Sequence, residues 1–285
     1  MAAAGVGAVV LAAAVLPAQA ADEPGKSVTV GCGKNRTQAL HRALVKSAPI
    51  GKPVTVYLTK GCRYTYPDKR KQFSVPDGRT IIGHGAVLEG RTDLYPVLTS
   101  LTSGSRITLE DVTLTGPSLC VLVPAYSHFT LKNVNLHCSQ SMTAMRVKDD
   151  GAADLLGDTE LRGGGAPTAH GGGGGLIIER GGTVHLRDRA KITNFALSTR
   201  MVDVPAGGGE TITNQKTGEL VTTPYTPARG YQTDGIGAGV LNRGTLTVED
   251  QATITGNKIV RTTQQPKYPL APDDHHAYKG GGIYN

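Results

Sequence analysis

A repeated pattern near the middle of the chain constrains its fold more than any other feature. The segments 106–114 and 128–136 superimpose with a shift of 22 residues, which matches Ile107 to Phe129 and Leu114 to Leu136. In each segment, polar and apolar residues alternate on both sides of a two-residue corner, a pattern typical of two short strands. The chain therefore contains consecutive copies of one structural unit.

Three further copies follow with a three-residue corner, at intervals that lengthen to 24, 31 and 62 residues. Their apolar positions are Ala153, Leu155, Thr159 and Leu161; then Val184, Leu186, Ala190 and Ile192; then Leu246, Val248, Ala252 and Ile254. A period near 22 residues with short strands is typical of a β-solenoid, whose coils stack around one continuous core. We therefore expect an all-β fold in which the strands of successive coils pair in parallel. We also expect an inserted loop at 195–232.

One segment near the start has a helical pattern instead. Between residues 36 and 48, Ala39, Leu40, Ala43 and Leu44 fall on a single helical face. We expect a capping helix that covers the first coil, because an open solenoid end exposes apolar core and unpaired strand edges. Asn35 or Thr37 is the expected N-cap. An independent N-terminal domain is the alternative, although no linker separates one. The 38 Gly and 16 Pro argue against a bundle of such helices.

Residues 1–20 are expected to be a signal peptide, since an apolar run over 5–16 precedes a small-residue cleavage site at 18–20. The mature domain then spans 21–285 and is secreted or extracellular, with no transmembrane segment. The alternative is an apolar helix of a cytosolic protein. No Lys or Arg precedes Lys26, so we expect the start codon to lie upstream of Met1. Because Val240 aligns with Ile283, we also expect a truncated C-terminus.

Four cysteines in an exported chain predict two disulfides, for which three connectivities exist. Proximity in the sequence favours Cys32 with Cys62 and Cys120 with Cys138. Free buried thiols are the alternative interpretation.

Several motifs carry a resemblance to a known family. They are Gly-Gly-Gly-Ile-Tyr-Asn at 280–285, Gly-Thr-Leu-Thr-Val at 244–248 and Thr-Ile-Thr-Gly-Asn at 253–257. With these motifs the chain resembles the secreted right-handed parallel β-helix proteins of the pectate-lyase-like superfamily, especially bacterial surface proteins. It is also similar to the repeats of polymorphic outer membrane proteins, which have Phe where this chain has Ile254. The resemblance implies a single-stranded right-handed parallel β-helix, but that superfamily hosts lyases, hydrolases and adhesins alike.

Two catalytic templates of that superfamily were compared with the residues. The acidic and His-containing motifs of polygalacturonases have fragments at 83–85, 149–150 and 232–234, but in the wrong order for one groove. A lyase needs a basic residue to remove a proton beside a uronate carboxylate, often with Ca²⁺. Arg146 and Lys148 are the candidate catalytic residues, and Asp149, Asp150 and Asp154 the candidate metal ligands. A solvated turn between coils is the favoured interpretation of this segment.

Two other motifs have simpler interpretations. The sequence Asp-Asp-His-His at 273–276 contains metal-ligating residues, but a solvated loop is the expected structure, since neighbouring side chains of a strand diverge. The glycine run at 171–175 lacks the Lys-Ser/Thr ending of a phosphate-binding loop, and we interpret it as a turn between coils.

Charge gives the clearest indication of a partner. Residues 21–100 contain 13 Lys or Arg and 6 Asp or Glu, whereas residues 101–285 contain 17 of each. Lys69, Arg70 and Lys71 form the densest cluster and are the candidate binding residues. Such a basic end attracts an anionic polysaccharide or cell-envelope polymer; the alternative is a solvated basic loop that aids solubility. Export and the lack of a recognised module disfavour nucleic acid. We expect non-enzymatic binding or adhesion without a required cofactor; the alternative is a polysaccharide lyase that uses Ca²⁺.

Overall fold

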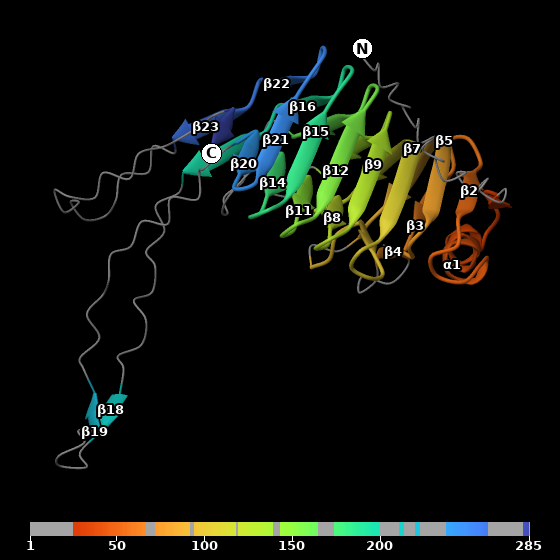
Figure 1. Cartoon of the computed structure of the whole chain (residues 1–285), viewed down its shortest axis with the longest axis horizontal. Helices are drawn as coiled ribbons and strands as arrows, with labels where there is room; N and C mark the ends of the chain where they lie inside the picture. Colours follow the sequence, from red (N-terminus) through yellow and green to blue (C-terminus); the bar gives the residue numbers. More distant parts are fainter. Residues whose placement is uncertain are drawn as a thin grey trace, which may run out of the picture.

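The chain forms short strands that pair in parallel along one axis, as a computed structural model shows (Figure 1). The structure describes residues 25–66, 72–91, 94–117, 119–138, 143–164, 174–199, 211–213, 220–222, 238–261 and 282–284. The predicted signal peptide, the cluster 69–71 and the motif 273–276 lie outside these residues.

The largest sheet has thirteen strands among the described residues, and its members come from two faces of the stack. The strands are β1 (Lys26–Val30), β2 (Val54–Leu58), β3 (Arg63–Thr65), β5 (Arg79–Glu89), β7 (Arg106–Thr115), β9 (His128–Lys132), β10 (Asn135–His137), β12 (Ala152–Leu156), β13 (Glu160–Arg162), β15 (Thr183–Leu186), β16 (Lys191–Thr193), β21 (Thr245–Val248) and β22 (Thr253–Thr255). Both β5 and β7 run through a corner, and they thereby join the two faces.

A second sheet of seven parallel strands forms the third face. Its strands are β4 (Phe73–Val75), β6 (Leu98–Ser100), β8 (Val121–Val123), β11 (Met145–Val147), β14 (Leu176–Ile178), β20 (Val240–Asn242) and β24 (Ile283–Tyr284). The chain visits the three faces in turn, so the sheets curl round the axis into a nearly closed, solenoid-like arrangement. The expectation of an all-β fold with parallel pairing between coils is thus confirmed.

The register predicted from the repeats is also confirmed. Ile107 pairs with Phe129, which pairs with Ala153, and Leu114 pairs with Leu136. The pairing continues through the widely spaced copies, where Val184 pairs with Leu246. Because strand side chains alternate between faces, these in-register positions all point inward.

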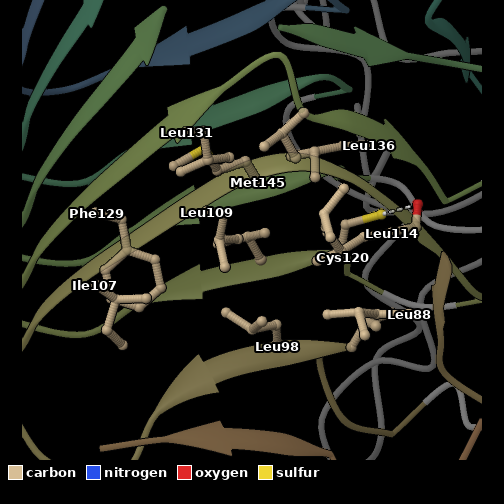
Figure 2. Close-up of a cluster of buried hydrophobic side chains, with 14 of the residues drawn as sticks. Leu88, Leu98, Ile107, Leu109, Leu114, Cys120, Phe129, Leu131, Leu136 and Met145 are labelled. Carbon is tan, nitrogen blue, oxygen red and sulfur yellow. Dashed lines mark hydrogen bonds between the residues drawn. The ribbon is translucent and has the colours of Figure 1, made fainter. Parts of the chain in front are cut away.

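The core consists of these inward ladders. Figure 2 shows part of it, where side chains from three faces meet in one cluster. Leu109, Phe129, Leu131 and Leu136 are completely buried. Each coil therefore shields the apolar side of its neighbours, as a stacked repeat requires.

Asn and Asp side chains support the corner between the first two faces. Asp111, Asn133 and Asp188 have φ values of 51°, 54° and 55°, a left-handed conformation that these residue types tolerate. The side-chain oxygen of Asn133 accepts a hydrogen bond from the backbone N–H of Asp158 at 3.0 Å, and Asp188 accepts one from Gly157 at 2.7 Å. The corners of successive coils are thus bonded to one another.

The predicted capping helix is α1 (Arg36–Lys46), which ends two residues before the expected boundary. It buries Leu40, Ala43 and Leu44 against the first strands, as predicted. The expected N-cap bond does not form. Asn35 occupies the N-cap position without a side-chain cap, whereas the Thr37 hydroxyl bonds both backbone groups of Thr65.

Two disulfides have the connectivity that proximity favoured. Cys32 is bonded to Cys62 and Cys120 to Cys138, with Cα–Cα distances of 5.6 and 5.7 Å. The first disulfide joins the turn before α1 to the turn between β2 and β3. The second joins the residue before β8 to the residue after β10.

The segment predicted as an inserted loop includes three short strands. Its first residues form β17 (Ala196–Thr199), which pairs in parallel with β23 (Lys258–Arg261). Farther along, β18 (Thr211–Thr213) and β19 (Leu220–Thr222) pair antiparallel. A search of the described residues for a helix long and apolar enough to cross a membrane finds none.

Candidate binding site

An irregular corner in β5 creates the most distinctive surface feature. Ile82 pairs with Glu110 and Ala86 pairs with Val112, so three residues of β5 lie opposite one residue of β7. A side chain at Gly83 would collide with Val112, and Gly85 has a φ of 78°. Gly83 thus lets the backbone of β5 lie close to Val112 of β7, and Gly85 permits a left-handed turn. The His84 side chain between them is exposed on the outer surface.

A pocket of about 460 Å³, which we call the corner pocket, lies beside this turn. Polar side chains from three coils and the turn after β2 line it. They include Lys60, His84, Asp111, Thr113, Asn133 and Asn135. The imidazole of His84 also stacks on the Tyr57 ring, with 6.3 Å between centroids and 8° between planes.

The corner pocket has free hydrogen-bonding groups. Lys60, His84 and Asn135 are exposed, and within the part of the chain that the structure describes their side chains form no hydrogen bond or ion pair. Lys60 provides a cation, and Asn135 provides both a donor and acceptors. The pocket can therefore bind a ligand rich in hydroxyl groups that also carries negative charge.

The surrounding coils are strongly basic. Residues 25–66 and 72–91 contain ten cationic side chains and only two carboxylates, Asp77 and Glu89. The cations are Lys26, Lys34, Arg36, Arg42, Lys46, Lys52, Lys60, Arg63, Arg79 and Arg91. The corner pocket thus lies in the part of the stack that attracts anions over the longest range.

The predicted catalytic pair is found on another face, at the end of β11. Arg146 and Lys148 do lie side by side, and both bind one carboxylate, Glu179. The Arg146 Nε and the Lys148 Nζ are 2.5 and 3.1 Å from Glu179 Oε1. Burial raises the pKa of Glu179, but the hydrogen bonds from Lys148 and Arg146 lower it by more, so the net pKa is below its ordinary value.

This shared carboxylate predicts a pH-dependent contribution to stability. The lowered pKa of Glu179 stabilises the folded state at pH values above the ordinary Glu pKa, and this contribution is lost as pH falls through the folded-state pKa. We expect Glu179→Gln to lower the free energy of unfolding by about 1 kcal/mol at pH 7. Urea titrations should show the difference shrinking below about pH 4. A difference that grows toward acid would contradict this assignment.

The three predicted metal ligands do not gather in one place. Asp154 lies outward on β12 and binds His128, with 2.7 Å between Oδ2 and Nε2. Asp149 and Asp150 belong to the turn after β11, on the other side of a corner. Within the described ranges, no group of three His, Cys, Asp or Glu side chains could hold a metal ion. Asp154 lies on a different face from Asp149 and Asp150, so the structure does not bring the three carboxylates together, and the ion site stays a prediction.

The sequence carries a signal for the corner pocket. His84 belongs to a fragment of a polygalacturonase motif, whereas Lys60, Asp111 and Asn135 belong to no catalytic or binding motif. In the alignment of 79–89 with 107–115, the earlier segment has two extra residues at one corner. Comparisons with known proteins add no homologue, since no protein family, curated protein or solved structure matches this chain.

Proposed function

We propose that this chain is a secreted or cell-surface right-handed parallel β-helix protein of the pectate-lyase-like type, which binds an anionic polysaccharide or cell-envelope polymer without altering it. The observation that carries the proposal is the corner pocket, where Lys60 and His84 from the basic end of the stack meet Asn135 of a later coil, all three without a hydrogen-bond or ion-pair partner among the described residues. The two disulfides support an oxidising, extracytoplasmic environment.

The chemistry of the pocket suits an acidic sugar. The Lys60 ammonium pairs with a carboxylate, and Asn135 and Thr113 bond ring hydroxyls. The Tyr57–His84 stack offers a flat apolar surface next to these polar groups, and Tyr57 is 36% exposed. An open pocket of this kind binds a polymer along its length instead of enclosing one small molecule.

The lyase alternative receives no support from the contacts of its candidate bases. Arg146 and Lys148 are both engaged in ion pairs with Glu179, so neither side chain is presented free to a substrate. We therefore propose binding as the function.

Titration calorimetry with polygalacturonate tests the proposal. We expect the Lys60→Ala and His84→Ala variants to bind about 10-fold more weakly, since one charge-assisted bond or one stacking surface is lost. Binding by the unaltered protein should also weaken as NaCl is raised. Lys191→Ala is the matched control, because Lys191 is an exposed cation on the same face in a later coil.

The control should retain full affinity and the same salt dependence. If wild-type protein binds no anionic glycan, or if Lys191→Ala weakens binding as much as Lys60→Ala does, the corner pocket is not the binding site.

A further inference from the structure

A second pocket of about 440 Å³ lies on the same face as the corner pocket, and we call it the edge pocket. It is formed where β3, β5, β7 and β10 end, and its lining includes Arg63, Glu89, Thr115, Pro117 and His137. Nothing in the sequence analysis assigned a role to these residues.

The edge pocket contains an arginine held in place by a carboxylate. Arg63 Nη1 is 3.0 Å from Glu89 Oε1, and the Thr65 hydroxyl donates to Glu89 Oε2 at 2.7 Å. Both Glu89 oxygens are thus engaged, while the Arg63 side chain remains 52% exposed. The guanidinium has five N–H donors in a fixed fork, so an oriented Arg63 keeps donors for a second carboxylate.

His137 adds a free polar group on the other wall. Its side chain is exposed at the end of β10 and, within the described ranges, forms no hydrogen bond or ion pair. The imidazole can donate to or accept from a sugar hydroxyl. Arg63 and His137 therefore offer an anion-binding group and a hydroxyl-binding group in one pocket.

The two pockets are connected by two strands. On β7, Thr113 lines the corner pocket and Thr115 lines the edge pocket; on β10, Asn135 and His137 do the same. Residues two apart on a strand point to the same face and are about 6.7 Å apart. The pockets are therefore the two ends of one outward surface that follows the strand direction.

We propose that the edge pocket is a second subsite for the acidic glycan whose binding at the corner pocket is proposed above, on which this inference rests. One linear chain lies across β7 and β10, with a carboxylate on Lys60 at one end and a second carboxylate on Arg63 at the other. The ligand class is thus a glycan with repeated uronate groups, because a single uronate has one carboxylate and the two pockets each offer a cation.

Calorimetry with galacturonate monomer and octamer tests this inference. We expect wild-type protein to bind the octamer at least about 10-fold more tightly than the monomer, since two subsites act together. His137→Ala and Arg63→Gln should each weaken octamer binding about 5-fold and leave monomer binding at the corner pocket unchanged. Lys60→Ala should weaken both. Among the described residues, the polar atoms of the exposed His137 contact no other group, so we expect its removal to leave folding intact, which thermal melts verify.

The outcomes separate this inference from the proposed function. If the octamer binds and Lys60→Ala weakens it, but Arg63→Gln and His137→Ala have no effect, the second subsite is wrong and the first remains. Equal losses for monomer and octamer in Arg63→Gln also overturn the second subsite. If wild-type protein binds neither ligand, the proposed function itself fails.

Discussion

Replacement of Arg79 with alanine is expected to lower the free energy of unfolding by about 3–5 kcal/mol. Arg79 occupies an inward position in β5, in register with Val54 and Ile107, and is only 1% exposed. Its neighbours in that row are apolar. The charged guanidinium is stable at this buried position only because each of its three nitrogens donates a hydrogen bond.

The partners of Arg79 explain the size of the expected effect. The Nε donates to Leu44 O at 2.9 Å, and Nη2 donates to Ala48 O at 2.9 Å; these carbonyls lie at the end of α1 and just beyond it. Nη1 donates to Lys52 O at 2.6 Å. Helix ends leave carbonyls without intrahelical partners, so Arg79 acts as the C-terminal cap that binds the helix to the first coils. Burial lowers the pKa of Arg79, and Asp77 opposes that change.

Chemical denaturation of a small variant series measures this effect. Arg79→Met restores apolar volume but leaves the carbonyls unpaired, so we expect it to be nearly as destabilising as alanine. Arg79→Lys should recover part of the loss, because an ammonium supplies fewer and less well placed donors. Arg106→Ala is the control, since Arg106 lies outward and exposed, and should change stability by less than about 0.5 kcal/mol. Wild-type stability of Arg79→Met would refute the capping role.

Phe129→Ala is the second large effect, with an expected loss of about 3–5 kcal/mol. Phe129 is completely buried and lies in register between Ile107 and the small Ala153. Figure 2 shows its ring next to the Ile107 side chain. Since parallel ladders fix the spacing of successive coils, the neighbours cannot collapse into the vacated volume, and a cavity remains.

Thermal and urea denaturation test this second prediction with two comparisons. Phe129→Leu keeps most of the buried apolar volume and should cost much less than alanine. Tyr126→Ala, three residues earlier, removes an aromatic side chain that is 69% exposed and should be nearly neutral. Equal losses for Tyr126→Ala and Phe129→Ala would mean that inward packing does not stabilise this stack.

The repeat predicted most of the fold because its physical basis is local. Alternation at Ile107 and Leu109, repeated at Phe129 and Leu131, is sufficient to assign the inward face and the register of the ladder. The helix at Arg36–Lys46 is predictable for the same reason, because its apolar stripe is a local pattern. That stripe covers the first coil of the stack. These features depend on side chains that are close in sequence or separated by one repeat.

The remaining features depend on contacts that no repeat encodes. Arg79 pairs with carbonyls 27 to 35 residues away, so its burial was not predictable from charge alone. Lys60 meets His84 and Asn135 only because three coils stack at one corner. Likewise, Asp154 was grouped with Asp149 from proximity in sequence, although the turn between them places their strands on different faces.

Hydrogen–deuterium exchange with and without polygalacturonate tests the central claim most directly, because it locates the bound polymer on the stack. Binding at the corner pocket predicts slower amide exchange at 83–85, 111–113 and 133–135, with unchanged exchange at β11 and β14. Protection confined to the face of Arg146 and Glu179, or no change at the corner pocket while the polymer is bound, would contradict the proposed function.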